Sequence, residues 1–455
     1  MELRRIETPG ISHYAYLLAD DGGEAIVIDP RRDVDEYLSA ARAMGVRIRY
    51  IVETHRQEDF VMGSAHLAER TGAQIVNGVH DLFGHGDVRL SDSEMLELKG
   101  LRLQALHTPG HTPESMCYAV YTEQGGDAAW GVFTGDTLFF GETGRTDLAD
   151  PDRAEQHAGA LYDAVHQKLG GLADTAQVLP AHGPGSVCGS GMVALSSSTL
   201  GAERRYNPVF VSSRDEFARR KGAERLPRPP YFRHLERINL KGGVAPKGHP
   251  DAVALLDTDA FAAAMSDGIC IDTREPEAYA GGHVRDAYSI WLGGLPVFGG
   301  WVAEHDTPIY VVGDRTEDAA TSYLHLSRIG IDGLSGALAG GFGAWRRSGR
   351  PILSSGVTTP HELAERLSEV QILDVRDADE FASGHIPQAR NVYVGHLEAQ
   401  LAELELDRQR PVVVTCGVGH RAGLGVSILR RAGFQEVSNL LGGMSAWQAL
   451  RLRLD

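Results

Sequence analysis

The chain has 455 residues, of which 42% are hydrophobic and 23% charged, an ordinary composition for a globular protein. This length exceeds what one hydrophobic core usually serves, so we expect several domains. The formal net charge of −17 argues against nucleic acid or an anionic membrane surface as the main partner, because both attract positive surfaces.

Compartment and redox state are predicted from the N-terminus and the cysteines. The residues MELRRIETPG lack the apolar core of a signal peptide, and no run of about 18 apolar residues occurs. We therefore expect a cytoplasmic protein that does not cross a membrane. The four cysteines lie far apart without CxxC spacing, which favours free thiols over disulfides in a reducing compartment.

The first segment, residues 1–245, alternates strands and helices. It opens with strand-turn-strand signals, and a helix is predicted over residues 34–45 with Gly45 as its end. A last helix is expected before Pro208. Residues 226–243 are rich in proline and poor in apolar residues, so we predict an arm packed on this domain.

Residues 250–352 and 357–455 repeat each other. The stretch ICIDTREPEAYAGGHVRDAYSI aligns with QILDVRDADEFASGHIPQARNV, which pairs Asp272 with Asp374 and Arg274 with Arg376. Each copy has the pattern strand, helix, strand, helix, which indicates a parallel α/β sheet. We predict two sibling domains of about 100 residues each.

Four polar residues of the first segment each follow an apolar strand and a turn. His55 comes after residues 48–52, His111 after the turn TPG, Asp136 after GVFTG and His182 after QVLPA. The carboxyl ends of strands are where α/β folds place their chemistry, and imidazoles with a carboxylate bind transition metals. The set therefore predicts a metal site.

The motifs TPGHTPES, FTGDTLFFGETGRTDL, PAHGPGS and ERRYNP resemble the metallo-β-lactamase superfamily, and within it the persulfide dioxygenases, over residues 1 to about 210. The resemblance implies an αββα sandwich and one Fe(II) held by His55, His111 and Asp136. Such a ligand set leaves positions open for a sulfur ligand and O₂. Hydrolases of the superfamily instead bind two zinc ions.

Two positions of the first metal loop, ETHRQEDF, depart from the superfamily pattern. Gln57 and Phe60 stand where it has histidines. These losses argue against a two-metal hydrolase more than against a one-iron oxygenase. Residues beside a metal also orient its ligands, so a weak or inactive site stays open. Asp59 and His182 remain as candidates for supporting the ligands or for a second site.

Three arginines are candidates for binding a carboxylate or sulfonate, because a guanidinium fork matches planar oxyanions. They are Arg145 in GETGRTDL and Arg204 and Arg205 near the end of the domain. Ordinary ion pairing explains them equally well. Cys188 follows His182 closely, and we expect it to serve buried packing.

A glycine-rich loop follows Cys416, which ends the apolar strand PVVVTC. The loop residues are Gly417, Val418, Gly419 and His420. Backbone N–H groups of such a loop point inward and stabilise an anion. Together with Arg421 and the N-terminus of the next helix, they favour the thiolate. Cys416 is therefore the predicted nucleophile and carrier of a persulfide sulfur.

Residues 357–455 resemble a rhodanese, a sulfurtransferase, through LDVRDADEFASGHIPQARN upstream of the loop and LLGGMSAW downstream. Asp374, Arg376 and His385 match scaffold motifs of that family. In the earlier copy, Gly313 takes the place of the cysteine and Asp318 that of the arginine. Residues 250–352 therefore resemble an inactive rhodanese with a parallel sheet.

The whole chain resembles a fusion used in bacterial sulfide detoxification. The resemblance implies O₂-dependent oxidation of a small thiol persulfide, such as that of glutathione or coenzyme A, to sulfite. It also implies transfer of sulfane sulfur through Cys416, with sulfite or thiosulfate as partner, and a dimer or tetramer. Two alternatives stay open: a zinc hydrolase such as a thioesterase fused to a sulfurtransferase, and a sulfur carrier active only at Cys416.

Overall fold

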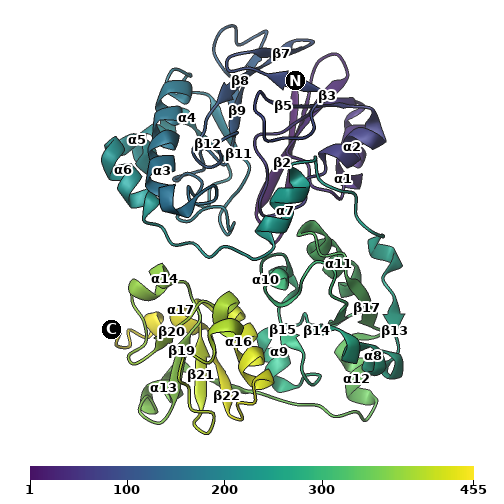
Figure 1. Ribbon diagram of the computed structural model, residues 1–455, viewed down its shortest axis with the longest axis vertical. Coiled ribbons are helices and arrows are strands. Elements are labelled where there is room, and N and C mark those ends of the chain that lie inside the picture. The colour runs from purple at the N-terminus through teal and green to yellow at the C-terminus, as the bar shows by residue number, and fades with distance from the viewer. The chain divides into compact units, whose positions relative to one another are not determined.

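The computed structural model describes residues 1–455, which divide into two compact units. The first comprises residues 1–246 and 328–330, and the second comprises residues 247–327 and 331–455. Figure 1 shows the elements of both. No helix is both long enough and apolar enough to cross a lipid bilayer.

Two six-stranded sheets form the centre of the first unit. One contains, in spatial order, β1 (Glu2–Thr8), β2 (His13–Ala19), β3 (Glu24–Ile28), β4 (Arg47–Val52), β5 (Gln74–Gly78) and β6 (Val88–Leu90). The other contains β12 (Ser198–Thr199), β11 (Gln177–Pro180), β10 (Gly131–Gly135), β9 (Met116–Thr122), β8 (Leu101–His107) and β7 (Met95–Leu98). Both sheets are mixed: β3 to β6 pair in parallel, as do β10 and β11, and the other neighbours are antiparallel.

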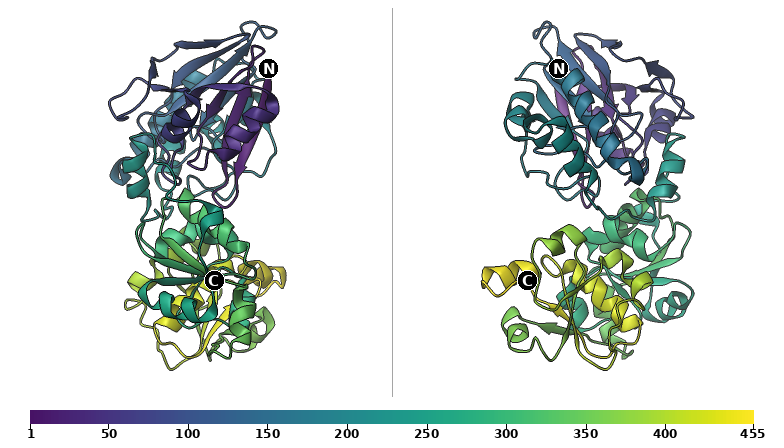
Figure 2. Two further views of the ribbon diagram at one scale, coloured as in Figure 1. Left: turned by 90° about the vertical axis from the view of Figure 1, so that its right-hand side faces the viewer. Right: turned by 60° about the vertical axis from the view of Figure 1, so that its left-hand side comes forward.

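Helices cover the outer face of each sheet (Figures 1 and 2). The helices of this unit are α1 (Asp35–Met44), α2 (Ser64–Thr71), α3 (Ala154–Ala164), α4 (Leu200–Tyr206), α5 (Pro208–Val211), α6 (Arg214–Gly222) and α7 (Phe232–Asn239), with one turn of 3₁₀-helix (Pro151–Arg153) and one of π-helix (Val165–Leu169). Tyr37 of α1 and Leu67 of α2 pack on the first sheet. Leu161 of α3 and Phe217 of α6 pack on the second. The layers are helix, sheet, sheet, helix, as predicted.

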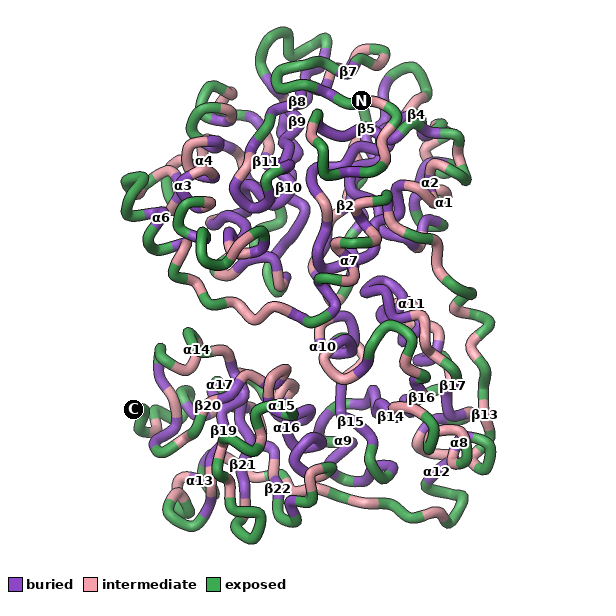
Figure 3. Tube along the Cα trace, viewed as in Figure 1, coloured by how far each residue is buried: buried purple, intermediate pink, exposed green.

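The sheets pack face to face over a shared core. Tyr16 and Val52 of the first sheet meet Leu103 and Phe133 of the second in one cluster. This burial supplies most of the drive for the sandwich to form. It also brings the carboxyl ends of β4, β10 and β11 to one edge, where polar loops follow. Figure 3 shows the buried residues concentrated along the strands and the exposed ones in the outer loops.

The second unit contains two five-stranded parallel sheets with the same strand order. The first is β13 (Leu255–Leu256), β17 (Leu334–Leu338), β16 (Ile309–Val312), β14 (Ile269–Asp272) and β15 (Tyr288–Ser289). The second is β18 (Gly356–Thr358), β22 (Val437–Leu440), β21 (Val412–Thr415), β19 (Gln371–Asp374) and β20 (Arg390–Asn391). Parallel sheets are the predicted result.

Short helices connect these strands. The helices of the first sheet's domain are α8 (Thr258–Ala264), α9 (Pro276–Gly281), α10 (Leu295–Val302), α11 (Asp318–Arg328) and α12 (Gly341–Arg347). This domain also has the 3₁₀ turns Pro250–Ala252, Met265–Asp267 and Leu292–Gly294. The helices of the second sheet's domain are α13 (Pro360–Glu365), α14 (Ala378–Ala382), α15 (Leu397–Gln400), α16 (His420–Arg431) and α17 (Gly443–Ala449), with the 3₁₀ turn Val394–His396.

The repeat extends to individual contacts. Arg274 donates to Asp272 from Nε at 2.8 Å, and Arg376 donates to Asp374 from Nε at 3.0 Å. His283 stacks on the ring of Tyr279 at a centroid distance of 3.9 Å. In the second copy, His385 stacks on Phe381 at 3.7 Å. The same buried pair and the same stack therefore hold both copies, in keeping with their scaffold assignment.

Candidate metal centre and cysteine loop

Three of the predicted ligands converge at the edge of the sandwich. His55 follows β4, His111 lies in the loop between β8 and β9, and Asp136 follows β10. Asp136 Oδ2 lies 3.4 Å from His111 Nε2 and 3.8 Å from His55 Nε2. All three side chains are buried, and their ligand atoms lie within 4.8 Å of one another. We call this set the triad site.

The facing atoms of the triad site have no hydrogen-bond partner. His55 Nε2, His111 Nε2 and Asp136 Oδ2 are buried and unpaired. Burying such atoms without partners is costly, and a bound cation would satisfy all three at once. The donors are two imidazoles and a carboxylate, a set that iron and zinc accept. The residues present therefore fit a metal ion.

Hydrogen bonds on the far side of each ring fix the tautomers. His111 Nδ1 lies 2.8 Å from the carbonyl oxygen of Arg145, to which it can only donate. His55 Nδ1 lies 2.9 Å from Thr54 Oγ1, and that hydroxyl donates to Asp29 at 2.7 Å. Both Nδ1 atoms are therefore protonated, which leaves the Nε2 lone pairs for a metal.

Burial and neighbouring charges set the protonation states of the three residues in different directions. Burial lowers the pKa of His55 to about 4, which keeps this imidazole neutral. Burial would raise the pKa of Asp136, but His182 and His111 outweigh it and hold that pKa well below its usual range. Burial would lower the pKa of His111, and Asp136 reverses the shift. A neutral imidazole and an ionised carboxylate are the forms that bind cations, so His55 and Asp136 are ready to bind, whereas His111 would release a proton when a metal ion binds.

Gln57 and Phe60 sit beside the triad site without joining it. Gln57 Nε2 lies 3.4 Å from His55 Nδ1, and the Phe60 ring packs on His13 at a centroid distance of 4.1 Å. Asn239 of α7 donates to the backbone carbonyls of both residues, at 2.7 and 2.8 Å. The predicted arm thus includes a helix that braces the metal loop. No local sequence motif marks Asn239 as part of this site.

Asp59 and His182 meet on the other side of Asp136. His182 Nδ1 lies 2.7 Å from Asp136 Oδ1, and His182 Nε2 lies 3.0 Å from Asp59 Oδ2. Burial would lower the pKa of His182, but Asp136 and Asp59 outweigh it and raise it well above its usual range. Cys188 is buried with them, so its surroundings are more polar than expected for simple packing. Burial also raises the pKa of the Cys188 thiol well above its usual range.

The cysteine loop, residues 416–421, runs from the end of β21 into the first residues of α16. Cys416 Sγ accepts hydrogen bonds from the N–H groups of Gly419 at 3.1 Å and Ala422 at 3.4 Å. These amides point at the sulfur and stabilise negative charge on it. Arg421 donates to both carboxylate oxygens of Glu380, at 2.5 and 2.8 Å, so its charge near the loop is shared with that carboxylate.

Gly442 and Gly443 allow the chain after β22 to pack closely against the backbone of the cysteine loop. Gly442 and Gly443 have φ angles of 69° and 53°, a region that favours glycine. A Cβ on Gly443 would lie 2.3 Å from the carbonyl oxygen of Cys416. That close approach lets the Met444 N–H donate to the same oxygen at 2.8 Å. The motif LLGGMSAW therefore fixes the backbone beneath the thiol.

Comparison with known proteins identifies the families of the domains that carry these residues. The family model described as metallo-beta-lactamase superfamily matches residues 8–182, and the rhodanese-like domain matches residues 257–348 and 359–450. Hydroxyacylglutathione hydrolase of Anaeromyxobacter dehalogenans is 33% identical over 234 residues, which cover 44% of this chain and 82% of that protein. The chain belongs to the metallo-beta-lactamase superfamily.

Two further likenesses refine this membership. Persulfide dioxygenase ETHE1 of Bos taurus is 28% identical over 246 residues, 53% of this chain and 89% of that protein. The crystal structure of a metallo-beta-lactamase from Staphylococcus aureus superposes with a TM-score of 0.65 at 27% identity, covering 74% of this chain and 99% of that one. The chain is thus a metallo-beta-lactamase domain with persulfide dioxygenase homologues, followed by two rhodanese-like domains.

The first rhodanese-like domain has no thiol in its loop. Gly313 follows β16 where Cys416 follows β21, and a Cβ there would lie 2.6 Å from Asp318 Oδ2. The Asp318 carboxylate also accepts from the Arg315 N–H at 3.0 Å. It fills the space that a cysteine side chain would need. The loop of this copy therefore holds no thiol that could carry a sulfur atom.

This first copy nevertheless contacts the loop of the second. His420 stacks on Trp291 at a centroid distance of 4.7 Å, and its Nε2 lies 3.0 Å from Glu275 Oε2. Both partners belong to the first rhodanese-like domain. The surroundings of Cys416 are therefore built by two domains. Glu275 lies 145 positions from His420 along the chain, so no local sequence pattern marks this contact.

The candidate substrate arginines are engaged within the metallo-beta-lactamase domain. Arg145 is buried and donates to both oxygens of Asp147, at 2.6 and 2.7 Å, and to three backbone carbonyls. Arg204 pairs with Asp174 and donates to three carbonyls near α4. Arg205 is exposed on the same helix. Arg145 and Arg204 therefore hold loops in place.

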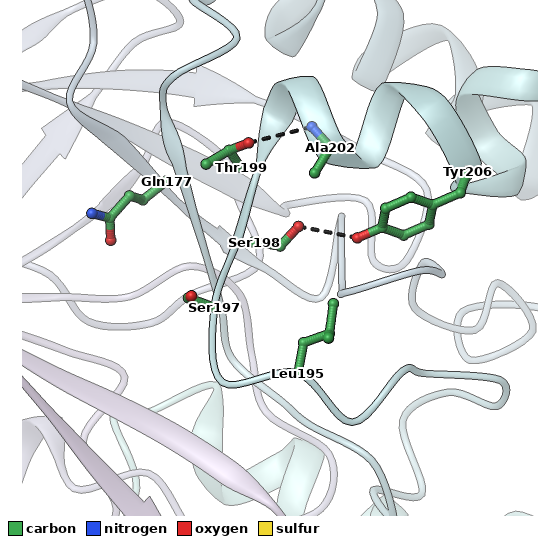
Figure 4. Close-up of a pocket in the computed structure, with 7 residues that line it drawn as sticks. All are labelled: Gln177, Leu195, Ser197, Ser198, Thr199, Ala202 and Tyr206. Atoms are coloured by element: carbon green, nitrogen blue, oxygen red, sulfur yellow. Dashed lines mark hydrogen bonds between the residues drawn. The ribbon is translucent and has the colours of Figure 1, made fainter.

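A separate hollow of about 470 Å³ lies beside β12 and α4. Figure 4 shows that Leu195, Ser198 and Tyr206 help to line it, with the Ser198 and Tyr206 hydroxyls 3.2 Å apart. None of its lining residues belongs to the triad site or the cysteine loop. It carries no group suited to the predicted chemistry.

Proposed function

We propose that this chain oxidises a low-molecular-weight persulfide at the triad site and transfers sulfane sulfur through Cys416. The observation that carries the first half is the set of unpaired atoms on His55, His111 and Asp136. Two imidazoles and one carboxylate are the facial triad of mononuclear iron oxygenases. The likeness to persulfide dioxygenases supports the same chemistry.

The residues of the triad site would hold one Fe(II). When bound, that ion would supply O₂ activation for the reaction of persulfide, O₂ and water to thiol, sulfite and two protons. Thr54 and the Arg145 carbonyl keep the imidazoles oriented. The apolar wall of Phe60, Ile11 and Met62 limits the entry of water.

Cys416 would carry the second reaction. Its thiolate attacks the outer sulfur of a persulfide, the S–S bond breaks, and the small thiol leaves with a proton. Sulfite then takes that sulfur to give thiosulfate, and Cys416 regains its thiolate. The amides of Gly419 and Ala422 stabilise the negative sulfur in both states. We propose that the reverse reaction is also open, in which Cys416 takes sulfane sulfur from thiosulfate and releases sulfite.

A zinc hydrolase is the second candidate for the first domain. The identity with hydroxyacylglutathione hydrolase favours it, while Gln57 and Phe60 remove two histidines that a two-zinc site uses. A third candidate, a carrier active only at Cys416, requires the triad site to bind no metal. Metal content after anaerobic purification separates the three: one iron, two zincs or none.

The deciding experiment is O₂ uptake with glutathione persulfide. We expect uptake and sulfite formation by the wild type, loss of both in His111→Ala, and retention of uptake in Cys416→Ser with sulfite in place of thiosulfate. Absence of uptake in the iron-loaded wild type would refute the dioxygenase half. We propose further that the carrier thiol is glutathione or coenzyme A and that the protein is a cytoplasmic dimer or tetramer. We also propose domain limits at residues 1–245, 250–352 and 357–455.

A further inference from the structure

Glu58 lies in the same loop as His55, ETHRQEDF, and its side chain is fully buried. Its Oε1 accepts a hydrogen bond from Arg56 Nε at 3.3 Å. Its Oε2 has no hydrogen-bond partner and lies 3.7 Å from His111 Nε2, one of the facing atoms of the triad site. One oxygen of this carboxylate is therefore used inside the loop, and the other faces the triad site.

His111 Nε2 faces two carboxylate oxygens at once. Asp136 Oδ2 lies at 3.4 Å and Glu58 Oε2 at 3.7 Å, and neither contact is a hydrogen bond. A proton on Nε2 would form an ion pair with these carboxylates, but one N–H cannot point well at both oxygens. Atoms bound to one ion at about 2.1 Å lie roughly 3 to 4.2 Å apart. Both separations fall in that range, as expected of ligands around one metal ion.

Arg56 divides its charge between two buried acidic side chains. Its Nε lies 3.3 Å from Glu58 Oε1 and 3.7 Å from Glu114 Oε1, and both glutamates are buried. A buried carboxylate is costly unless nearby cations and hydrogen bonds compensate it in full. Glu58 therefore has charge to share with a metal ion on its Oε2 side.

Gln57 and Glu58 turn to different sides of the histidines. Gln57 Nε2 lies 3.4 Å from His55 Nδ1, on the side of that ring away from the triad site. The carboxylate of Glu58, the next residue, faces His111 Nε2 instead. We propose that Glu58 is a fourth protein ligand of the triad-site metal and replaces the histidine that the metal loop lacks at position 57. This inference rests on the metal binding of the proposed function.

A carboxylate from Glu58 changes both the charge of the triad site and its open positions. Glu58 and Asp136 together carry two negative charges, which balance a divalent ion held by two neutral imidazoles. Four protein ligands leave two positions of a six-coordinate ion. One is for the outer sulfur of the persulfide and one for O₂, so the persulfide binds the ion through a single atom. Without substrate, both positions hold water.

The test counts the water molecules on Mn²⁺ bound to metal-free protein, because Mn²⁺ is a six-coordinate ion that accepts oxygen ligands. In H₂¹⁷O, each bound water broadens the electron paramagnetic resonance lines of the ion. We expect two waters in the wild type and three in Glu58→Ala, because water enters the vacated position. Glu114→Ala, which truncates the other buried glutamate beside Arg56, should keep two. Three waters in the wild type, or equal numbers in the wild type and Glu58→Ala, overturn the inference.

Affinity gives a second reading. Chelator competition should show Mn²⁺ binding at least about tenfold weaker in Glu58→Gln, while Glu114→Gln stays within a few-fold of the wild type. His111→Ala should abolish binding of the counted ion, which assigns that ion to the triad site. A wild type that binds neither Mn²⁺ nor Fe²⁺ refutes the oxygenase half of the proposed function together with this inference. Binding that Glu58→Gln leaves unchanged refutes the inference alone. Circular dichroism of each variant checks that it is folded.

Discussion

Each histidine of the triad site depends on the partner of its other nitrogen. His55 donates to Thr54, which in turn donates to the buried Asp29. Thr54 thereby sets both the tautomer and the rotation of the ring. A residue that never touches the metal can therefore control how well the metal is held.

Thr54→Val tests this control with little change in shape. The valine cannot accept from His55 Nδ1, so we expect metal affinity at the triad site to fall roughly 10–100-fold. Thr54→Ser, which keeps the hydroxyl, should bind within a few-fold of the wild type. Competition with a coloured chelator measures both. Equal affinity in the valine variant would show that packing alone orients His55.

The pair of Arg421 and Glu380 makes a pH-dependent contribution to stability. Burial would raise the pKa of Glu380, but hydrogen bonds from Arg421 outweigh it and lower that pKa to about 2. A carboxyl with a depressed pKa stabilises the fold above its ordinary pKa of 4.5 and loses this effect as the pH falls toward 2.

We therefore expect Glu380→Gln to lower stability by about 1 kcal/mol at pH 7, a modest value because the pair is partly exposed. The deficit should shrink between pH 4.5 and 2. Tryptophan fluorescence during thermal unfolding measures it, because Trp291, Trp301, Trp345 and Trp447 all lie in the second unit. Glu403→Gln, at an exposed position, is the control. A deficit that stays constant down to pH 2 would contradict this account.

At the scale of elements, α7 braces the loop that carries His55. Asn239 donates to the carbonyls of Gln57 and Phe60, and its own oxygen accepts from the Met62 N–H at 2.9 Å. All of these groups are buried. A helix near the end of the first unit thus completes a loop that follows its fourth strand.

Asn239→Ala should destabilise the first unit by about 3 kcal/mol, because it leaves three buried backbone groups unpaired at roughly 1 kcal/mol or more each. Metal affinity at the triad site should fall with it. Arg233→Ala, on the exposed face of the same helix, should change neither quantity. Denaturant unfolding and chelator competition give the two readings. A variant as stable as the wild type would mean that water replaces the amide.

The sequence could predict those parts of the sites that depend on local patterns. His55, His111 and Asp136 each follow a strand, so their neighbours along the chain revealed them. Asn239 and Gln57 lie 182 positions apart, and no local signal links them. Tertiary packing likewise determines that the Arg145 guanidinium donates its hydrogen bonds to Asp147 and to backbone carbonyls. The same holds for Cys188, whose surroundings depend on Asp59.

At the scale of the whole molecule, the two proposed reactions are complementary. The metallo-beta-lactamase domain would release sulfite, and the second rhodanese-like domain would consume it. Covalent linkage raises the effective concentration of one site near another, on the order of millimolar for short linkers. A chain that carries both sites should therefore convert sulfite to thiosulfate before the sulfite escapes into solution.

An equal mixture of His111→Ala and Cys416→Ser chains tests the value of the linkage. The mixture contains each functional site, but on different chains, combined just before the assay so that subunits do not exchange. With persulfide and O₂, an aldehyde that traps free sulfite should lower thiosulfate formation several-fold more in the mixture than in the wild type. Without the trap, equal amounts of functional sites should give similar totals. If the trap lowers both equally, sulfite reaches Cys416 through bulk solution and the fusion gives no kinetic advantage.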